Sequence, residues 1–269
     1  MKRLLRDSRS HFKVDNELRA YRGLSDAVDG MPGALYIMRF HAVLGRYWQG
    51  SDSEIYMLWT PLAQVGDFSK FGSNSPLRQS VPNNVKLQLY YQALIGLEAL
   101  YHAGYIRRDL KSQNIGIVSL RERPRTVLID FGQTIHLDQG HDLTPSPAHC
   151  GTIGYLAPEL ENPQYAASYG QPIDIWSIGA VGYYLFDGGG RIPWSTKRNM
   201  FLPERDGNLS AIHVFESHHA TLRERPAGSL DALIASMLET DLRRRPTAKE
   251  LLEHAALRNV VGSIVSSIR

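Results

Sequence analysis

Cysteine is almost absent from the sequence, since Cys150 is the only one in 269 residues. A single cysteine excludes a disulfide bond within the chain, and small secreted proteins usually depend on several. Also missing is any run of about 18 apolar residues, the length that a membrane-spanning helix needs. The N-terminal stretch MKRLLRDSRSHFK is too polar after its first turn for a signal peptide. These absences predict a cytoplasmic or nuclear protein with no membrane partner.

The charges are nearly balanced, with 30 Lys and Arg residues against 27 Asp and Glu residues and a formal net charge of +3. A dedicated nucleic-acid binder usually carries a larger positive excess, so we expect no nucleic-acid partner. With 43% hydrophobic residues the chain can bury a substantial core. Its length fits one large domain or two lobes that share a cleft.

The pattern of apolar residues changes along the chain. The segments ALYIMRFHAVL and EIYMLWT, within residues 34–60, are rich in apolar and aromatic residues and are separated by a turn-like segment, WQGSDSE. Both segments are predicted to form strands. In residues 83–104 the apolar residues recur at helical spacing, and the predicted helix ends at Gly104. The expected fold class is α+β, with a sheet-containing part before a helical part.

Three later segments also have the apolar pattern of helices. Residues 172–189 are apolar nearly all round, which is typical of a helix at the centre of a helical lobe, and residues 229–241 and 247–260 are amphipathic and begin with N-cap residues. The predicted organisation is a small sheet-containing lobe (1–60), a hinge (61–66), a large, mostly helical lobe (67–257) and a C-terminal tail (258–269).

Two polar residues flank a predicted hairpin in the middle of the chain. Asn114 precedes the short apolar strand IGIVSL, the charged turn RERPR follows, and the strand TVLI ends at Asp130. Pairing of the two strands brings Asn114 and Asp130 together at the open end of the hairpin. An amide oxygen and a carboxylate are hard ligands suited to magnesium, so this end is a predicted Mg²⁺ site.

Asp109 and Lys111 lie in the loop just before this hairpin, in the stretch YIRRDLKSQNIGIV. A carboxylate there suits the task of accepting or orienting the proton of an attacking hydroxyl. The lysine is placed to offset charge on a phosphoryl group during its transfer. Together with the predicted Mg²⁺ site, these residues predict phosphoryl transfer.

Six motifs in this sequence resemble those of the eukaryotic protein kinase superfamily. RRDLKSQN is similar to the catalytic loop, DFG at 130–132 to the metal-binding motif, and GTIGYLAPE at 151–159 to the end of the activation segment. DIWSIG, PW and DLRRRPTAKELLEH follow in the family's order. The resemblance extends from about Ile55 to Leu257, and it implies a two-lobed protein-kinase-like fold.

The resemblance implies that the chain transfers the gamma phosphate of Mg-ATP to protein hydroxyl groups. Asp109 is then the catalytic base, Lys111 contacts the transferred phosphate, and Asn114 and Asp130 hold Mg²⁺. The DLK sequence of the loop, with Thr152 available to meet Lys111, is similar to the serine/threonine branch. The implied partners are ATP and a protein substrate with a Ser or Thr acceptor.

The resemblance also implies structural or regulatory roles for other residues. Glu159 pairs with Arg245, and Asp174 caps the backbone of the catalytic loop. Arg108 corresponds to the regulatory arginine that binds a phosphate on the activation segment.

Thr144 and Ser146 each precede a proline between the DFG and APE motifs, where an activating phosphate is often found in the family. The alternative interpretation is that TPSP is only a turn-rich loop.

The N-terminal part departs from the family. No G-x-G-x-x-G sequence occurs before the catalytic loop, so the small lobe is truncated and lacks the glycine-rich loop that covers ATP. The resemblance makes Lys2 and Glu17 the ion pair that positions the alpha and beta phosphates, and the alternative is two solvated charges. Under the first interpretation the chain starts inside the third strand of the small lobe. The sequence is then either part of a longer kinase or a natural form without this roof.

A second departure is Arg107, where the family usually has histidine beneath the DFG phenylalanine, here Phe131. We expect the guanidinium either to extend toward water or to pair with a carboxylate, because burying it unpaired is costly. We interpret Arg107 as a modifier of activation.

A catalytically impaired pseudokinase that acts as a binding or scaffolding module is the first alternative function. A small-molecule kinase of related fold, such as an aminoglycoside phosphotransferase, is the second, and GTIGYLAPE argues against it.

Overall fold

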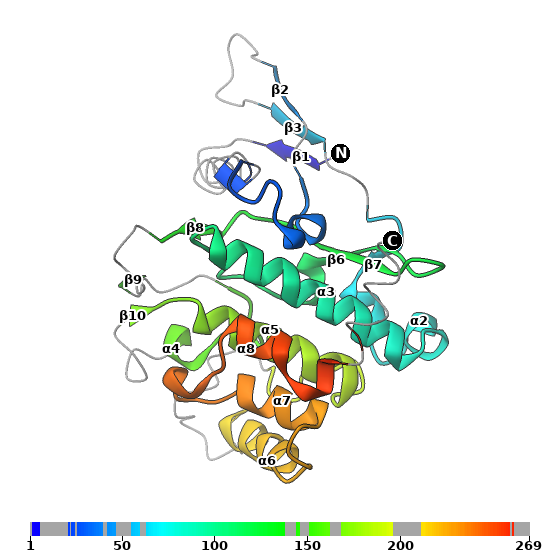
Figure 1. Ribbon diagram of the computed structural model, residues 1–269, viewed down its shortest axis with the longest axis vertical. Coiled ribbons are helices and arrows are strands. Elements are labelled where there is room, and N and C mark those ends of the chain that lie inside the picture. Colours follow the sequence, from blue (N-terminus) through cyan, green and yellow to red (C-terminus); the bar gives the residue numbers. More distant parts are fainter. Residues whose placement is uncertain are drawn as a thin grey trace.

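The computed structural model shows a small sheet next to a larger, mostly helical body (Figure 1). It describes residues 2–5, 21, 23–24, 26–39, 42–46, 55–59, 63–137, 144–145, 151–161, 168–195, 211–258 and 260. None of the helices in these ranges is long and apolar enough to cross a membrane. The arrangement agrees with the predicted α+β, two-lobed fold.

The small sheet has three antiparallel strands in the order β1-β3-β2. They are β1 (Lys2–Leu5), β2 (Ala42–Arg46) and β3 (Ile55–Trp59). Strand β3 is the predicted strand EIYMLWT and occupies the centre, with Leu5 paired to one end of it and Ala42 to the other. The first strand of the chain therefore joins this sheet directly.

The predicted strand ALYIMRFHAVL is wrong in its first half. Residues Pro32–Tyr36 form a 3-10 helix, η1, and only the end of the segment belongs to β2. Pro32 has no N–H for a strand ladder. Gly33 lies against helix α3 (Asn83–His102), since a Cβ on it would be 2.5 Å from the Cβ of Ala99. Within η1, Gly33, Ala34 and Tyr36 are buried in a helical turn packed on α3 and not in a strand ladder.

Two long helices organise the large lobe, and both were predicted. Helix α3 ends at His102, and Gly104 has a φ of 80°, in the left-handed region that favours glycine. Helix α5 (Pro172–Phe186) is buried along nearly its whole length, as its all-round apolar character predicts.

Shorter elements complete the lobe. They are α2 (Pro76–Ser80), α4 (Pro158–Glu161), α6 (Ala211–Arg223), α7 (Leu230–Met237), α8 (Ala248–Glu253) and the 3-10 helices η2 (Phe68–Phe71), η3 (Ser112–Asn114), η4 (Leu242–Arg244) and η5 (Ala255–Leu257). The predicted N-caps are present, because Ser229 caps α7 and Thr247 forms a capping box with Glu250 on α8.

The predicted hairpin is formed by β6 (Ile115–Ser119) and β7 (Arg125–Leu128), with β4 (Gly66–Asp67) beside β6. Gln92 of α3 fixes the hairpin on the helix. Its amide accepts from the N–H of Thr126 at 2.9 Å and donates to the carbonyl of Pro124 at 2.9 Å. Two further strand pairs are β5 (Tyr105–Ile106) with β8 (Ile135–His136) and β9 (Thr144–Pro145) with β10 (Ser168–Tyr169).

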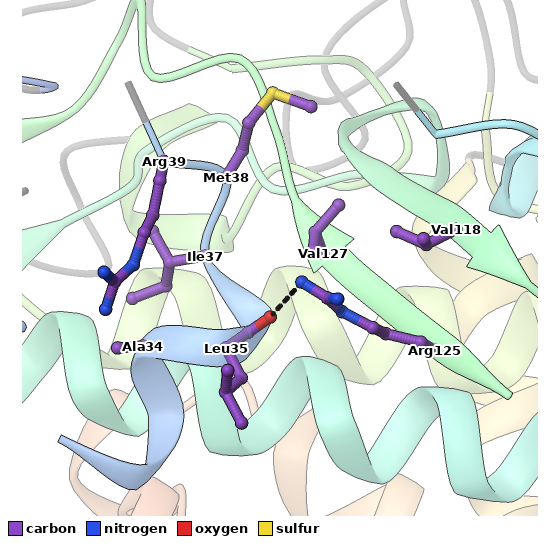
Figure 2. Close-up of a pocket in the computed structure, with 8 residues that line it drawn as sticks. All are labelled: Ala34, Leu35, Ile37, Met38, Arg39, Val118, Arg125 and Val127. Carbon is purple, nitrogen blue, oxygen red and sulfur yellow. Dashed lines mark hydrogen bonds between the residues drawn. The ribbon is translucent and has the colours of Figure 1, made fainter. Parts of the chain in front are cut away.

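A cavity of about 350 Å³ lies between η1 and the outer part of the hairpin (Figure 2). Its walls are mainly aliphatic, and Arg125 crosses its edge to donate to the carbonyl of Leu35 at 3.3 Å. The lining residues are Ala34, Leu35, Ile37, Met38, Arg39, Val118, Arg125 and Val127. The cavity contains none of the residues that the sequence singles out for chemistry.

Candidate active site

The catalytic loop is anchored on the central helix by Asp174. This side chain is fully buried at the start of α5, and its two oxygens accept the backbone N–H groups of Arg107 at 2.6 Å and Arg108 at 2.9 Å. Burial raises the pKa of Asp174 to about 6, although these two hydrogen bonds act in the opposite direction. The expected cap on the loop backbone is confirmed, and the most buried helix of the lobe fixes the loop's start.

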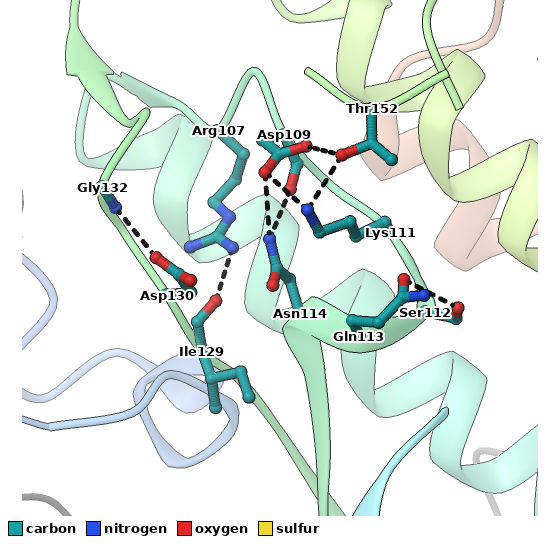
Figure 3. A network of polar contacts seen from close by, with 10 residues as sticks. All are labelled: Arg107, Asp109, Lys111, Ser112, Gln113, Asn114, Ile129, Asp130, Gly132 and Thr152. Atoms are coloured by element: carbon teal, nitrogen blue, oxygen red, sulfur yellow. Dashed lines mark hydrogen bonds and ion pairs between the residues drawn. The ribbon is translucent and has the colours of Figure 1, made fainter. Parts of the chain in front are cut away.

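Asp109, Lys111 and Thr152 form a closed triangle of polar contacts (Figure 3). The hydroxyl of Thr152 donates to Oδ1 of Asp109 at 2.6 Å, and Nζ of Lys111 lies 3.0 Å from Oδ2 of Asp109 and 2.8 Å from the Thr152 hydroxyl. The Asp109 and Lys111 side chains are 19% and 22% exposed, so a substrate can reach them. The expected contact between Lys111 and Thr152 is confirmed, and it holds the carboxylate in one orientation.

Asn114 and Asp130 emerge together from the open end of the hairpin, as predicted. The N–H of Ile129, beside Asp130, donates to the carbonyl of Asn114 at 3.0 Å. The side-chain nitrogen of Asn114 donates to the carbonyl of Asp109 at 2.8 Å, which leaves the amide oxygen as the atom for a ligand. Asp130 has a φ of 61°, a left-handed conformation that is strained for any residue with a Cβ and is typical of functional sites.

The donor atoms at this end fit magnesium. One carboxylate and one amide oxygen are hard ligands, and Mg²⁺ usually keeps further positions for water and phosphate oxygens. Among the described residues, no group of three or more His, Cys, Asp and Glu side chains could hold a metal ion. A metal at Asn114 and Asp130 therefore depends on phosphates and water for the rest of its coordination shell.

Arg107 lies against Phe131, as the sequence suggested, but its guanidinium does not reach water. The residue is only 1% exposed and lies with Cζ 4.2 Å from the centre of the Phe131 ring. Its Nη2 donates to the carbonyl of Ile129 at 2.6 Å, whereas Nε and Nη1 have no hydrogen-bond partner in the described part of the chain. The expected extension to solvent is wrong because the cation is retained by the aromatic face and one backbone carbonyl.

Phe131 is also contacted by Tyr21, a residue that sequence reasoning missed. The ring of Tyr21 meets it edge-on with ring centres 4.9 Å apart, and the Tyr21 hydroxyl lies 3.9 Å from the sulfur of Met38. No local pattern in the sequence singles out Tyr21. A continuous stack thus connects Arg107 with the small lobe.

The segment after Thr152 is tied to the helical lobe. Arg245 makes a two-pronged ion pair with Glu159 at 2.6 and 2.8 Å, with both side chains essentially unexposed, and donates to the carbonyl of Glu239. The hydroxyls of Tyr155 and Ser112 are 2.7 Å apart, which links the segment to the loop that contains Asp109. The expected Glu159–Arg245 pair is confirmed.

Arg108 contacts neutral partners in the described residues. Its Nε donates to the carbonyl of Gln133 at 2.7 Å and its Nη1 to the hydroxyl of Tyr169 at 3.0 Å. Tyr169 pairs with Thr144 across strands β9 and β10, so the arginine and the candidate phosphorylation site meet the same residue.

The other candidate residues are only partly covered by the structure. Glu17 and Ser146 lie outside the described residues. Of Lys2 and Thr144 only the backbone is described, in β1 and β9.

Comparison with known proteins agrees with this geometry. The family model for the protein kinase domain matches residues 36–257. Calcium/calmodulin-dependent protein kinase cmkA of Emericella nidulans is 32% identical over 181 residues, which cover 65% of this chain and 40% of that protein. Mitogen-activated protein kinase kinase kinase 1 of Arabidopsis thaliana is 32% identical over 220 residues, which cover 80% of this chain and 32% of that protein.

A third relative is a calcium and calcium/calmodulin-dependent serine/threonine-protein kinase of Lilium longiflorum, 32% identical over 168 residues that cover 62% of this chain and 30% of the relative. The chain spans less than half the length of each of these three relatives. The family match covers most of the chain and contains the anchored loop, the hairpin and the Glu159–Arg245 pair. The chain therefore belongs to the protein kinase family.

Proposed function

We propose that this chain is a serine/threonine protein kinase that transfers the gamma phosphate of Mg-ATP to hydroxyl groups of proteins. The triangle of Asp109, Lys111 and Thr152 next to Asn114 and Asp130 is the observation that carries the proposal. Phosphoryl transfer needs a residue that orients the acceptor, a cation for the transferred group and oxygen ligands for Mg²⁺. All three occur within one loop and the hairpin that follows it.

Asp109 orients the acceptor hydroxyl and accepts its proton. The carboxylate is held by Thr152 and Lys111, so it does not have to be ordered when the substrate arrives. Lys111 offsets negative charge on the phosphoryl group during transfer. Asn114 and Asp130 would hold Mg²⁺, and the bound ion would neutralise part of the phosphate charge.

The serine/threonine preference rests on the DLK sequence of the loop and on the contact between Lys111 and Thr152. The printed name of the Lilium longiflorum relative specifies the same class of acceptor. We also propose that the chain divides into a small lobe (1–60), a hinge (61–66) and a large lobe (67–257).

Two further assignments complete the proposal. Lys2 and Glu17 position the alpha and beta phosphates, which is supported by the pairing of the Lys2 strand with β3 in the small sheet. Arg108 receives a phosphate on Thr144 or Ser146, which is supported by the position of Thr144 opposite Tyr169, the residue that Arg108 already contacts.

A pseudokinase is the second candidate function. It is favoured by the positive charge of Arg107 beneath Phe131. Such a protein would keep the fold and bind a partner without transferring phosphate.

Transfer of labelled gamma phosphate from Mg-ATP to a generic basic protein and to the chain itself separates the two candidates. Asp109→Asn and Asp130→Asn remove the proposed base and one metal ligand, and Asp29→Asn is a matched control because the Asp29 side chain is 71% exposed. Transfer by the wild type and the control, but by neither active-site variant, supports the kinase. Equal background in all four proteins supports the pseudokinase.

A further inference from the structure

Arg107 poses an energetic problem that the proposed reaction does not explain. A guanidinium has five N–H donors, and at 1% exposure the residue has no access to water. Two of its three nitrogens have no hydrogen-bond partner in the described residues. Burying a cation with unpaired donors is unfavourable, and the contacts that Arg107 does make show what it can hold in place.

These contacts fall on both sides of Asp130. The Nη2 of Arg107 bonds to the carbonyl of Ile129 at 2.6 Å, and the guanidinium lies 4.2 Å from the centre of the Phe131 ring. The same residue is fixed at its backbone by Asp174 on the central helix. Arg107 therefore connects the central helix to the residues before and after the proposed metal ligand, and Figure 3 shows its bond to Ile129.

The surroundings of the guanidinium are acidic. Burial lowers the pKa of the Arg107 guanidinium, and the nearby Asp174, Asp130, Tyr21 and Asp109 oppose this lowering. Asp174 is already engaged with two backbone N–H groups, and Asp109 with Thr152 and Lys111. Oδ1 of Asp130 accepts a hydrogen bond from the N–H of Gly132 at 3.4 Å, and the backbone of Asp130 is in the left-handed region, with a φ of 61°.

We infer that Arg107 is a positioning residue for Asp130, a fixed internal cation that holds residues 129–131 in the metal-ready conformation before any metal binds. Its charge has a second effect, because a cation beside the carboxylate opposes the binding of a divalent ion there. The inference rests on the proposed function in one respect, that Asp130 is a metal ligand.

Two substitutions separate the charge of Arg107 from its shape. Arg107→Lys keeps the charge but loses the planar group that stacks on Phe131 and reaches Ile129. Arg107→Met keeps an unbranched side chain that can pack on the aromatic ring and removes the charge. Asp130→Asn reports how much metal binding depends on the proposed ligand.

The electron paramagnetic resonance signal of free Mn²⁺ measures how much Mn²⁺ binds to the full chain at low ionic strength. This measurement reports the effect of the Arg107 charge without any enzymatic turnover. We expect Asp130-dependent binding that is about tenfold tighter in Arg107→Met and within about twofold of wild type in Arg107→Lys, since the interaction is Coulombic. Binding that tightens in neither variant, or equally in both, overturns the electrostatic role. Equal Mn²⁺ binding by wild type and Asp130→Asn refutes the metal site of the proposed function instead.

Hydrogen exchange at the amides of residues 130–134 reads out the positioning. Arg107→Met should raise exchange there by roughly tenfold, because the bond to the Ile129 carbonyl is lost, while the amides of α7 keep wild-type protection and show that the lobe is folded. Unchanged exchange at 130–134 in a folded Arg107→Met protein would overturn the positioning role. If Arg107→Met does not fold, Arg107→Lys must show the raised exchange for the inference to stand.

Discussion

Asp174→Asn tests how the buried carboxylate of α5 contributes to both stability and activity. In the folded protein the pKa of Asp174 is about 6, against an ordinary value of 3.8, chiefly because the carboxylate is removed from water. The folded state thus takes up a proton at this site before the unfolded state does. The stability that this proton contributes is fully present below the ordinary pKa and is lost as the pH rises through about 6.

The magnitude follows from the size of the shift. At about pH 5, Asp174 is mostly protonated in the folded protein and mostly ionised in the unfolded chain. This difference makes the free energy of unfolding about 1.4 kcal/mol larger than at about pH 7.5. Asparagine cannot titrate, so the variant lacks this term. When the pH is lowered from about 7.5 to about 5, the free energy of unfolding of the wild type should therefore rise by about 1.4 kcal/mol relative to that of the variant.

Urea unfolding of wild type, Asp174→Asn and the exposed control Asp29→Asn at both pH values measures this difference. The reasoning is refuted if the gap between wild type and Asp174→Asn is the same at both pH values or moves in the opposite direction. Phosphate transfer should fall in Asp174→Asn at either pH, because its single amide oxygen leaves the N–H of Arg107 or Arg108 without an acceptor.

Three further changes have defined outcomes. Glu159→Gln leaves the charge of Arg245 buried and should lower the free energy of unfolding by about 3–5 kcal/mol in a urea titration, and a loss below about 1 kcal/mol would contradict the buried pair. Thr152→Ala frees one side of Asp109 and should lower the rate of phosphate transfer by roughly ten- to hundredfold with little change in the KM for ATP, whereas a change in KM alone would argue against orientation of the base. Gly33→Ala forces a Cβ into α3 and should cost about 1–3 kcal/mol of stability by thermal unfolding, and an unchanged Tm would show that η1 can move away from the helix.

Much of the large lobe could be predicted from the sequence because its signals are local. The 3.6-residue period defines α3 and α5, the turn RERPR between two apolar runs defines the hairpin, and the caps at Ser229 and Thr247 define the starts of α7 and α8. The hairpin also placed Asn114 and Asp130 side by side, since the ends of paired strands must meet.

The errors come from contacts between segments that are distant in the sequence. The apolar residues of η1 have the composition of a strand, but the space beside Gly33 is occupied by α3, which no local pattern reveals. The same applies to Tyr21, whose ring contact with Phe131 spans more than a hundred positions. For Arg107 the family resemblance predicted the position beneath Phe131 correctly. Whether its guanidinium is hydrated or lies on an aromatic ring is decided by the packing around it.

Three buried charged groups show why the site is arranged on the helical lobe as it is. Asp174 and the Glu159–Arg245 pair each place their charge against backbone N–H groups or an opposite charge, so every one of them fixes a segment of chain to the core. A buried ion pair is seldom a source of net stability, and what it provides in exchange for its desolvation cost is a single arrangement of the parts that it joins. Arg107 differs because it is only partly hydrogen-bonded, and it lies beside two residues whose backbone is in the left-handed region, Arg108 and Asp130. Backbone strain and unpaired donors are therefore concentrated at this point, while the surrounding anchors are fully bonded. This is the arrangement expected of a loop that is held ready for a ligand before the ligand binds.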